Sequence, residues 1–372
     1  MIKKRRQRNR RLGDKILTCF LLAHIVYNQR YFTMDGKSND SHSLEARMAD
    51  LASEQLQQNP AGWPVAVLAL FERAITCEYA TLTSQHTPIT YPVTPYIGDD
   101  GRTLDVSTGL AYPTKAERAR RIPKVALLYS DPVGSGLSKP PVVLVLGLAS
   151  VRDANLQHNT DRYIRMSMSK VPSAYKSIPA FLLRRMPWYL ARIWIQVTPL
   201  RILWWPAGEI EGQPHMWQAP TETAAPVSDP APSGKALGVW KAAPADWRSG
   251  AKYAVQNLGD PILTIVTADG FPLPFRVRNA TLVPDGIRVH VPAGFPASVT
   301  GSACLTFHTH PEEFTGQQNL VFVGQVQQEA TGYVFKVERQ LGDWSLAGSR
   351  LRATWDFFRN GRKLAPRLAV EA

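Results

Sequence analysis

Short runs of β-branched and aromatic residues, separated by Gly, Pro and Asp-Gly turns, recur along most of the chain. Runs of this length and chemistry are typical of antiparallel strands joined by tight turns. In the first half, the pattern predicts strands near residues 78–84, 89–97, 103–108, 124–130, 141–151 and 193–205. In the second half, it predicts strands near residues 262–267, 273–280, 287–291, 302–308, 319–328, 332–340 and 350–358. Many short strands of this kind indicate a barrel or a sandwich.

Helical patterns are few and lie at matching places in the two halves. Residues 65–74 follow Trp63, and residues 251–258 follow Trp247, 184 residues further on. Two more helices are predicted at residues 161–168 and 177–190, where they would cover one end of a barrel.

The same spacing repeats beyond the two tryptophans. Residues 79–83 align with residues 263–267 at the offset of 184. Further matches follow at nearly the same spacing: Pro88 with Pro272, Asp100-Gly101 with Asp285-Gly286, and Gly109 with Gly294. Further on, the run that ends at Gly147 resembles the run that ends at Gly324. Self-similarity at a fixed spacing is the sequence signature of a repeated fold. We therefore predict a mainly β protein with two tandem barrels that face each other as an intrachain pseudo-dimer.

Composition divides the 372 residues into four segments. A basic and apolar extension covers residues 1–33, and the first barrel covers residues 45–205. Residues 206–245 are rich in Pro and Ala and predict a semi-extended linker. The second barrel covers residues 246–372.

The net charge of +13 is concentrated at the N-terminus. Residues 1–33 hold nine basic residues and one acidic residue, which is +8 and leaves +5 for the other 339. The body of the chain therefore gives no argument for a nucleic-acid partner. The extension itself has an apolar run too short to span a bilayer and lacks a signal-peptide cleavage pattern. Three interpretations stay open: an over-extended gene start, a membrane-surface anchor without stable insertion, or a disordered basic arm.

The cysteine pattern favours a reducing compartment. Cys19, Cys77 and Cys304 lie far apart and form no C-x-x-C pair. A disulfide framework or a zinc site is therefore not indicated, and we expect a cytoplasmic protein.

A basic segment in the first half has no equivalent in the second. Between Gly109 and Val125 the sequence predicts a helical turn that carries Lys115, Arg118, Arg120 and Arg121. Basic residues at the start of a helix beside a barrel edge suit a phosphate group. The alternative is a solvated basic helix face.

At this segment the sequence resembles a known family. Strand, turn, strand, Asp-Gly and strand are followed by Ser107-Thr108-Gly109 and then by Lys115-x-x-Arg-x-Arg-Arg-x-Pro123-x-Val125. This order is similar to the pyridoxamine 5′-phosphate oxidase-like family of FMN-binding split barrels. Ile122 stands where that family usually has Asn or Asp. The resemblance covers residues 60–205 and, more weakly, residues 245–372.

The resemblance implies a cofactor that lies between two barrels. Family members are usually homodimers with two sites, so a tandem chain with one degraded copy implies one site per chain. Lys115 and Arg118 would bind the phosphate, with Ser107 and Thr108 at the preceding strand end. Tyr91, Pro92, Val93 and Thr94 would line the ring through backbone contacts. FMN is the expected cofactor, with an 8-hydroxy-5-deazaflavin coenzyme as the alternative.

Two classes of function follow from the resemblance. One is an oxidoreductase that uses a flavin or a deazaflavin on a small organic substrate; the other is a non-catalytic protein that binds a flavin, haem or a similar planar ligand. In the first class the cofactor carries the redox chemistry, so no catalytic residue is expected to stand out. The chain is expected to act as a monomeric pseudo-dimer or as a higher homo-oligomer.

Two further features have structural alternatives. His308 and His310 are spaced like metal ligands on a strand, but no third ligand is identifiable, so structural histidines are the favoured interpretation and no metal is expected. Residues 188–205 combine tryptophans with arginines, a pattern that we interpret as a buried strand with a basic edge.

Overall fold

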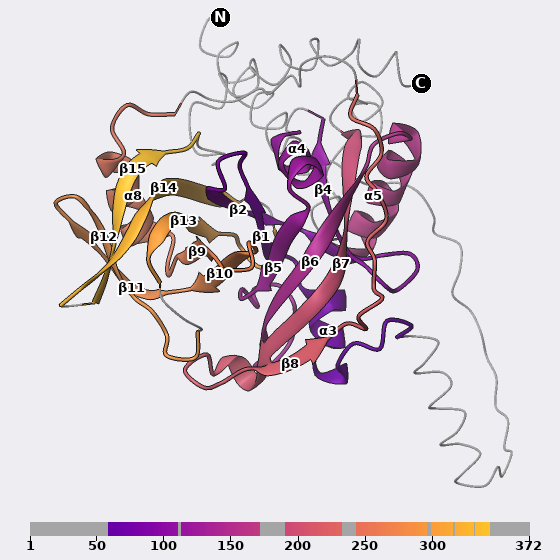
Figure 1. Cartoon of the computed structure of the whole chain (residues 1–372), viewed down its shortest axis with the longest axis horizontal. Coiled ribbons are helices and arrows are strands. Elements are labelled where there is room, and N and C mark those ends of the chain that lie inside the picture. The colour runs from indigo at the N-terminus through magenta and orange to yellow at the C-terminus, as the bar shows by residue number, and fades with distance from the viewer. Residues whose placement is uncertain are drawn as a thin grey trace, which may run out of the picture.

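The computed structural model describes residues 59–110, 113–171, 190–232, 243–295, 299–314, 317–330 and 332–342. This part of the chain is mainly β, with two curled antiparallel sheets and four α-helices. In Figure 1 the first half, in indigo to pink, lies beside the second half, in orange to yellow. The predictions for residues 1–33 and 350–358, and nearly all of that for 177–190, lie outside the described residues.

The first sheet has eight strands and follows the order β2-β1-β5-β6-β7-β4-β3, with β8 paired to β7. Its strands are β1 (Cys77–Leu82), β2 (Pro88–Val93), β3 (Pro95–Ile97), β4 (Leu104–Gly109), β5 (Lys124–Tyr129), β6 (Val142–Arg152), β7 (Arg192–Trp205) and β8 (His215–Gln218). Every strand predicted for this half is present, and the run near residues 89–97 is divided into two strands.

The second sheet has seven strands and follows the order β10-β9-β13-β14-β15-β12-β11. Its strands are β9 (Ile262–Val266), β10 (Pro272–Arg276), β11 (Arg278–Val283), β12 (Gly286–His290), β13 (Gly301–Thr309), β14 (Gln318–Glu329) and β15 (Gly332–Gln340). This is the strand order of the first sheet, with each strand replaced by the one eight positions later. The predicted repeat is therefore confirmed.

The equivalent glycines Gly147 and Gly324 have the same structural role in the two halves. The register shifts by one residue at Gly147 in β6 and again at Gly324 in β14, because the partner strands β7 and β15 each bulge by one extra residue, Leu200 and Glu338. A Cβ atom at Gly147 would lie 2.5 Å from the carbonyl oxygen of Thr198, and one at Gly324 would lie 1.9 Å from that of Lys336. Only glycine allows the neighbouring backbone to approach this closely.

Helices distinguish the two halves. They are α3 (Val65–Arg73), α4 (Thr114–Arg121), α5 (Leu156–Lys170) and α8 (Arg248–Asn257), with a 3-10 turn at Pro206–Gly208. The helices α3 and α8 occupy equivalent places before β1 and β9. By contrast, α4 is inserted between β4 and β5, and α5 lies between β6 and β7, whereas a short turn joins β14 to β15. None of the described helices is long and apolar enough to cross a membrane.

The two halves pack through their edge strands in a pseudo-two-fold manner. Strand β2 packs against β9, β13 and β14, and its equivalent β10 packs against β1, β5 and β6. The largest hydrophobic core contains Ala80 and Leu128 from the first half together with Phe275 from the second. The predicted pseudo-dimer is thus a single packed unit.

Part of the predicted linker is docked on the first sheet. The Ser228 hydroxyl accepts a hydrogen bond from the backbone N–H of Val151, and the backbone N–H of Asp229 donates to the Val151 carbonyl. The Asp229 carboxylate also accepts hydrogen bonds from the backbone N–H groups of Asp153 and Ala154. This stretch is extended, as its composition predicts, but it is held in place. The domain boundaries themselves stay predictions.

Candidate functional site

The basic helix α4 is seated against the first sheet by its small residues. Ala116 and Ala119 are fully buried in the core of the first half, where their methyl groups allow close approach. On another side of the helix, Arg120 donates to the Asp153 carboxylate at 2.7 Å and to the backbone carbonyl of Asp229. These contacts hold α4 against the first sheet, where it packs on β1, β6 and β7.

Lys115 lies on the side of α4 that faces strand β2. Its ammonium nitrogen is 5.1 Å from the centre of the Tyr91 ring, within the range of a cation–π contact. Burial, together with the positive charges of Arg118 and Arg192, lowers the pKa of Lys115 to about 8. An anion bound beside Lys115 would therefore be attracted by several neighbouring positive charges.

Arg118 lies one helical turn after Lys115. Its Nη1 atom is buried and has no hydrogen-bond partner, and the same holds for the hydroxyl oxygen of Tyr79 on β1. Burial lowers the pKa of the Arg118 guanidinium, and Tyr79 is one of the groups whose interaction raises it. No carboxylate in the described ranges forms an ion pair with Arg118. A buried, unpaired guanidinium N–H costs free energy that an anionic acceptor would recover.

Arg192 is the third cation at this place. It begins β7 directly opposite Gly109, the residue that ends β4 just before α4. Its guanidinium carbon lies 4.1 Å from the centre of the Tyr163 ring on α5. Lys115, Arg118 and Arg192 are called the basic cluster below. The aromatic strand was expected to have a basic edge, but nothing in the sequence placed Arg192 beside Lys115.

The residues expected to line a cofactor ring lie on an edge strand. Tyr91, Pro92 and Val93 end β2, which is the outermost strand of its sheet, and Thr94 follows it. An edge strand has backbone N–H and C=O groups that do not pair within its own sheet. The carbonyl of Thr90 already accepts a hydrogen bond from the Thr306 hydroxyl of the second half. This edge therefore faces the boundary between the halves.

Ser107 and Thr108 do not point in the same direction. Neighbouring residues of a strand lie on opposite faces of the sheet. Ser107 lies on the same face as Gly109 and as Arg192, the residue that pairs with Gly109 on β7. Thr108 lies on the other face, with Val106 in the core of the first half. The structure thus brings Ser107 to the face of Arg192 and directs Thr108 to the other face.

The pseudo-equivalent place in the second half is filled with aromatic rings. Phe275 pairs with Leu263 as Tyr91 pairs with Tyr79, so Phe275 is the counterpart of Tyr91. Phe295 stacks on Phe275 with ring centres 4.5 Å apart, and on Trp205 of the first half with ring centres 4.7 Å apart. Aromatic packing in the second half thus replaces the cation that lies over Tyr91 in the first.

The two histidines of the second half contact the first half. The Nε2 atom of His308 lies 2.8 Å from the Glu78 carboxylate, and the Nε2 atom of His310 lies 2.9 Å from the Thr76 hydroxyl. The same Glu78 oxygen accepts hydrogen bonds from Ser130 and Arg276. Among the described residues, no group of three or more His, Cys, Asp or Glu is placed to hold a metal ion. The histidines belong to a buried network that joins the halves.

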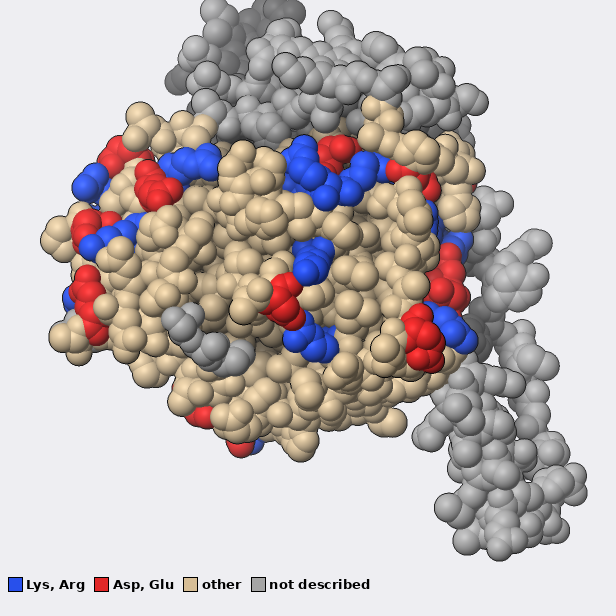
Figure 2. All heavy atoms as spheres, in the orientation of Figure 1, with Lys and Arg blue, Asp and Glu red and all other residues tan. Residues whose placement is uncertain are grey.

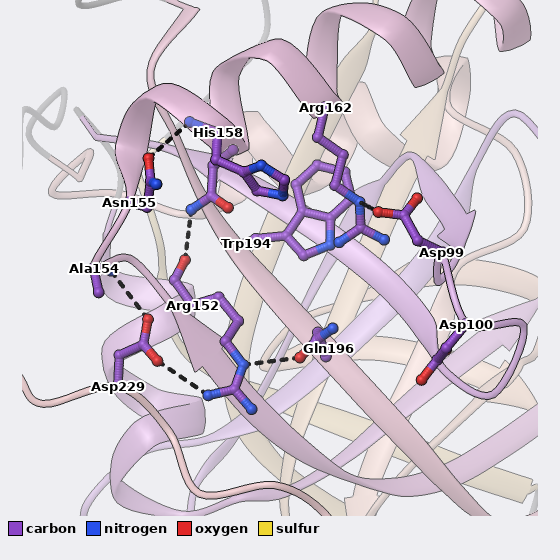
Figure 3. A pocket seen from close by; sticks show the side chains of 11 residues that line it. Asp99, Asp100, Arg152, Ala154, Asn155, His158, Arg162, Trp194, Gln196 and Asp229 are labelled. Carbon is purple, nitrogen blue, oxygen red and sulfur yellow. Dashed lines mark hydrogen bonds and ion pairs between the residues drawn. The ribbon is translucent and has the colours of Figure 1, made fainter.

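A pocket of about 370 Å³ lies apart from the basic cluster, beside the first turns of α5 (Figure 3). Most of its charged groups are paired with one another. Arg162 binds Asp99 at 3.0 Å and stacks on the Trp194 ring, and Arg152 binds Asp229 at 3.0 Å. Because these pairs already neutralise each other, the pocket offers an anion less than the basic cluster does.

Figure 2 shows how charge is distributed over one face of the molecule. Lys and Arg are interspersed with Asp and Glu, and no continuous basic band crosses the described part of this face. A broad phosphate-backbone footprint would need such a band.

Comparison with known proteins gives structural neighbours only. No family model matches the sequence, and no curated protein is similar to it. Among solved structures, general stress protein 26 of Bacillus anthracis is 15% identical, covering 41% of this chain and 95% of its own, with a TM-score of 0.28. An F420 reductase is 20% identical, and the match covers 38% of this chain and 98% of the reductase, with a TM-score of 0.28. A Clostridium acetobutylicum protein of the pyridoxinephosphate oxidase family is 12% identical, with shares of 40% and 89% and a TM-score of 0.27.

Each of these solved proteins matches less than half of the chain. What the structure itself shows is that each half is a curled antiparallel sheet and that the two sheets have the same strand order. At these identities and TM-scores, the similarity carries no conclusion about activity.

Proposed function

We propose that the chain binds FMN between its halves and acts as a flavin-dependent oxidoreductase on a small organic substrate. The observation that carries the proposal is the basic cluster of three cations, together with two buried polar atoms that have no hydrogen-bond partner, Arg118 Nη1 and the nearby Tyr79 hydroxyl oxygen. A phosphate dianion supplies acceptor oxygens for such donors and balances the charge.

The residues around the cluster fit the rest of a flavin. Tyr91 offers an aromatic ring directly beside Lys115, and the β2 edge offers backbone groups toward the boundary between the halves. When bound, the flavin supplies the electron-transfer chemistry. The protein's own contribution is to bind the phosphate, orient the ring and exclude water. Since Phe295 and Trp205 fill the pseudo-equivalent place, we expect one FMN per chain.

The first experiment compares FMN with riboflavin, which lacks the phosphate. We expect wild-type protein to bind FMN at one site per chain, at least tenfold more tightly than riboflavin, because two or more charged hydrogen bonds are lost without the phosphate. Fluorescence quenching and calorimetry measure both affinities and the stoichiometry. Equal affinities for the two flavins would refute the phosphate site.

Two further measurements distinguish FMN from a deazaflavin and an oxidoreductase from a binding protein. Mass spectrometry of the small molecule released from purified protein distinguishes FMN from a deazaflavin. Anaerobic reduction of the bound flavin by NADH or NADPH, followed by its absorbance, is expected for an oxidoreductase. A binding protein would be favoured if neither nucleotide reduces the bound flavin and if the flavin, once reduced with dithionite, passes its electrons to none of the substrates screened.

A further inference from the structure

Arg339 of the second half lies on the face of β15 that is turned toward the first half. On β15, Arg339 lies directly opposite Val323 of β14. Paired residues of an antiparallel ladder share a face, and Val323 packs in a small cluster with Tyr91 and Cys304 at the boundary between the halves. Leu341, two residues after Arg339, packs against the same cluster. Strand alternation therefore directs Arg339 toward the first half as well.

The repeat identifies the counterpart of Arg339. In each half the strand register shifts at the equivalent glycine, Gly147 or Gly324. The residue just before that glycine can therefore be compared between the halves through its partner on the neighbouring strand. In the first half Leu146 pairs with Arg201, and in the second half Val323 pairs with Arg339. Arg201 and Arg339 thus occupy equivalent places and carry the same side chain.

Their partners across the boundary differ. Arg201 binds the carboxylate of Asp269 at 2.5 Å, in the β9–β10 hairpin of the opposite half. The β1–β2 and β9–β10 hairpins are closed by the same hydrogen bonds. These join Thr83 to Thr87 in the first hairpin and Thr267 to Phe271 in the second. This match makes Gln85 the counterpart of Asp269. An uncharged side chain therefore occupies the place where symmetry would put a carboxylate for Arg339.

The charge of Arg339 reaches the basic cluster. It lowers the pKa of Arg118, although less than burial does. Within the part of the chain that the structure describes, no carboxylate forms an ion pair with Arg339. One of two equivalent arginines is thus neutralised by the opposite half, and the other faces a second arginine.

We propose that Arg339 binds the phosphate of the same ligand as Lys115 and Arg118, so that the anion site is completed by the second half. This inference rests on the proposed function and extends it, because it gives the second copy a direct part in binding.

The matched pair of arginines supplies the experiment. We expect Arg339→Ala to weaken FMN binding about five- to tenfold and to leave riboflavin binding unchanged, because only FMN has the phosphate. The control is Arg201→Ala, which removes the equivalent side chain but one that Asp269 already neutralises. Its affinity for FMN is expected to equal that of the wild type.

A second variant tests the same point without removing the arginine. Gln85→Asp places a carboxylate at the position equivalent to Asp269, and because Gln85 is exposed in its hairpin turn we expect the fold to be kept. It is expected to pair with Arg339 and to weaken FMN binding, again with no effect on riboflavin.

The outcomes separate this inference from the proposed function. FMN binding that is unchanged in both Arg339→Ala and Gln85→Asp overturns the role of Arg339, even when wild-type protein prefers FMN to riboflavin. A wild type without that preference overturns the phosphate site itself. Equal weakening by Arg201→Ala and Arg339→Ala would indicate a general charge effect and would also overturn the specific role.

Discussion

Glu78→Ala is expected to lower the free energy of unfolding by about 3–5 kcal/mol, the range for removing one partner of a buried ion pair. Glu78 is fully buried, and its Oε1 atom lies 3.0 Å from the Ser130 hydroxyl, 3.0 Å from Arg276 Nη2 and 2.8 Å from His308 Nε2. Without the carboxylate, the buried ring of His308 loses its partner, and Arg276 loses one acceptor but keeps the Ser130 hydroxyl and the Asp260 carbonyl. Urea denaturation followed by tryptophan fluorescence measures the loss.

The network is expected to matter for the whole chain because it crosses the boundary between the halves. Glu78 and Ser130 belong to the first half, and Arg276 and His308 belong to the second. The main core also contains side chains from both halves, so we expect a single cooperative transition that Glu78→Ala shifts to lower urea.

The control for this prediction is Glu329→Ala. Glu329 lies 4.0 Å from Arg288, and both side chains are about 40% exposed, at 41% and 40%. Exposed pairs contribute about 0–1 kcal/mol because water and salt screen them. Similar losses for Glu78→Ala and Glu329→Ala would show that the buried network contributes little to holding the halves together.

Turn chemistry made the strands and the repeat predictable. Asp100-Gly101 lies in the turn between β3 and β4, as expected from the preference of Asp-Gly for tight turns, and Asp285 lies in the turn between β11 and β12, where Gly286 already pairs with Val283. The equivalent glycines at 147 and 324 were visible as a sequence match, although their reason, a bulge with close backbone approach, needed the structure. Strand β8 was missed because its sequence lies inside a proline-rich stretch without alternation.

The candidate site was only partly predictable. Lys115 and Arg118 share one local segment, so the sequence could indicate them together. Arg192 and Arg339 reach the same place through strand pairing over long sequence separations, which no local pattern encodes. Glu78 was missed for a related reason: a single acidic residue in an apolar strand has no meaning until its partners on another sheet are known. Ile122, where the family usually has Asn or Asp, ends α4 without a polar side chain at that position.

Lys115→Ala is expected to weaken FMN binding by about 1–3 kcal/mol, the range for losing a charged hydrogen-bond partner. Riboflavin binding is expected to change little, since the ammonium would bind the phosphate. The measurement is a fluorescence titration of both flavins at pH 7, where Lys115 is charged because its pKa lies at about 8.

The same pKa predicts how FMN affinity depends on pH. Burial and the neighbouring charges of Arg118 and Arg192 lower the pKa of Lys115 to about 8, so the free protein loses this cation as the pH rises from 7 to 9. A phosphate with its second pKa near 6 stays a dianion over that range. We therefore expect FMN affinity to fall between pH 7 and 9, by an amount that approaches the effect of Lys115→Ala. Lys115→Arg keeps its charge throughout this range and should abolish the fall, whereas a fall that persists in Lys115→Arg would assign the titration to another group.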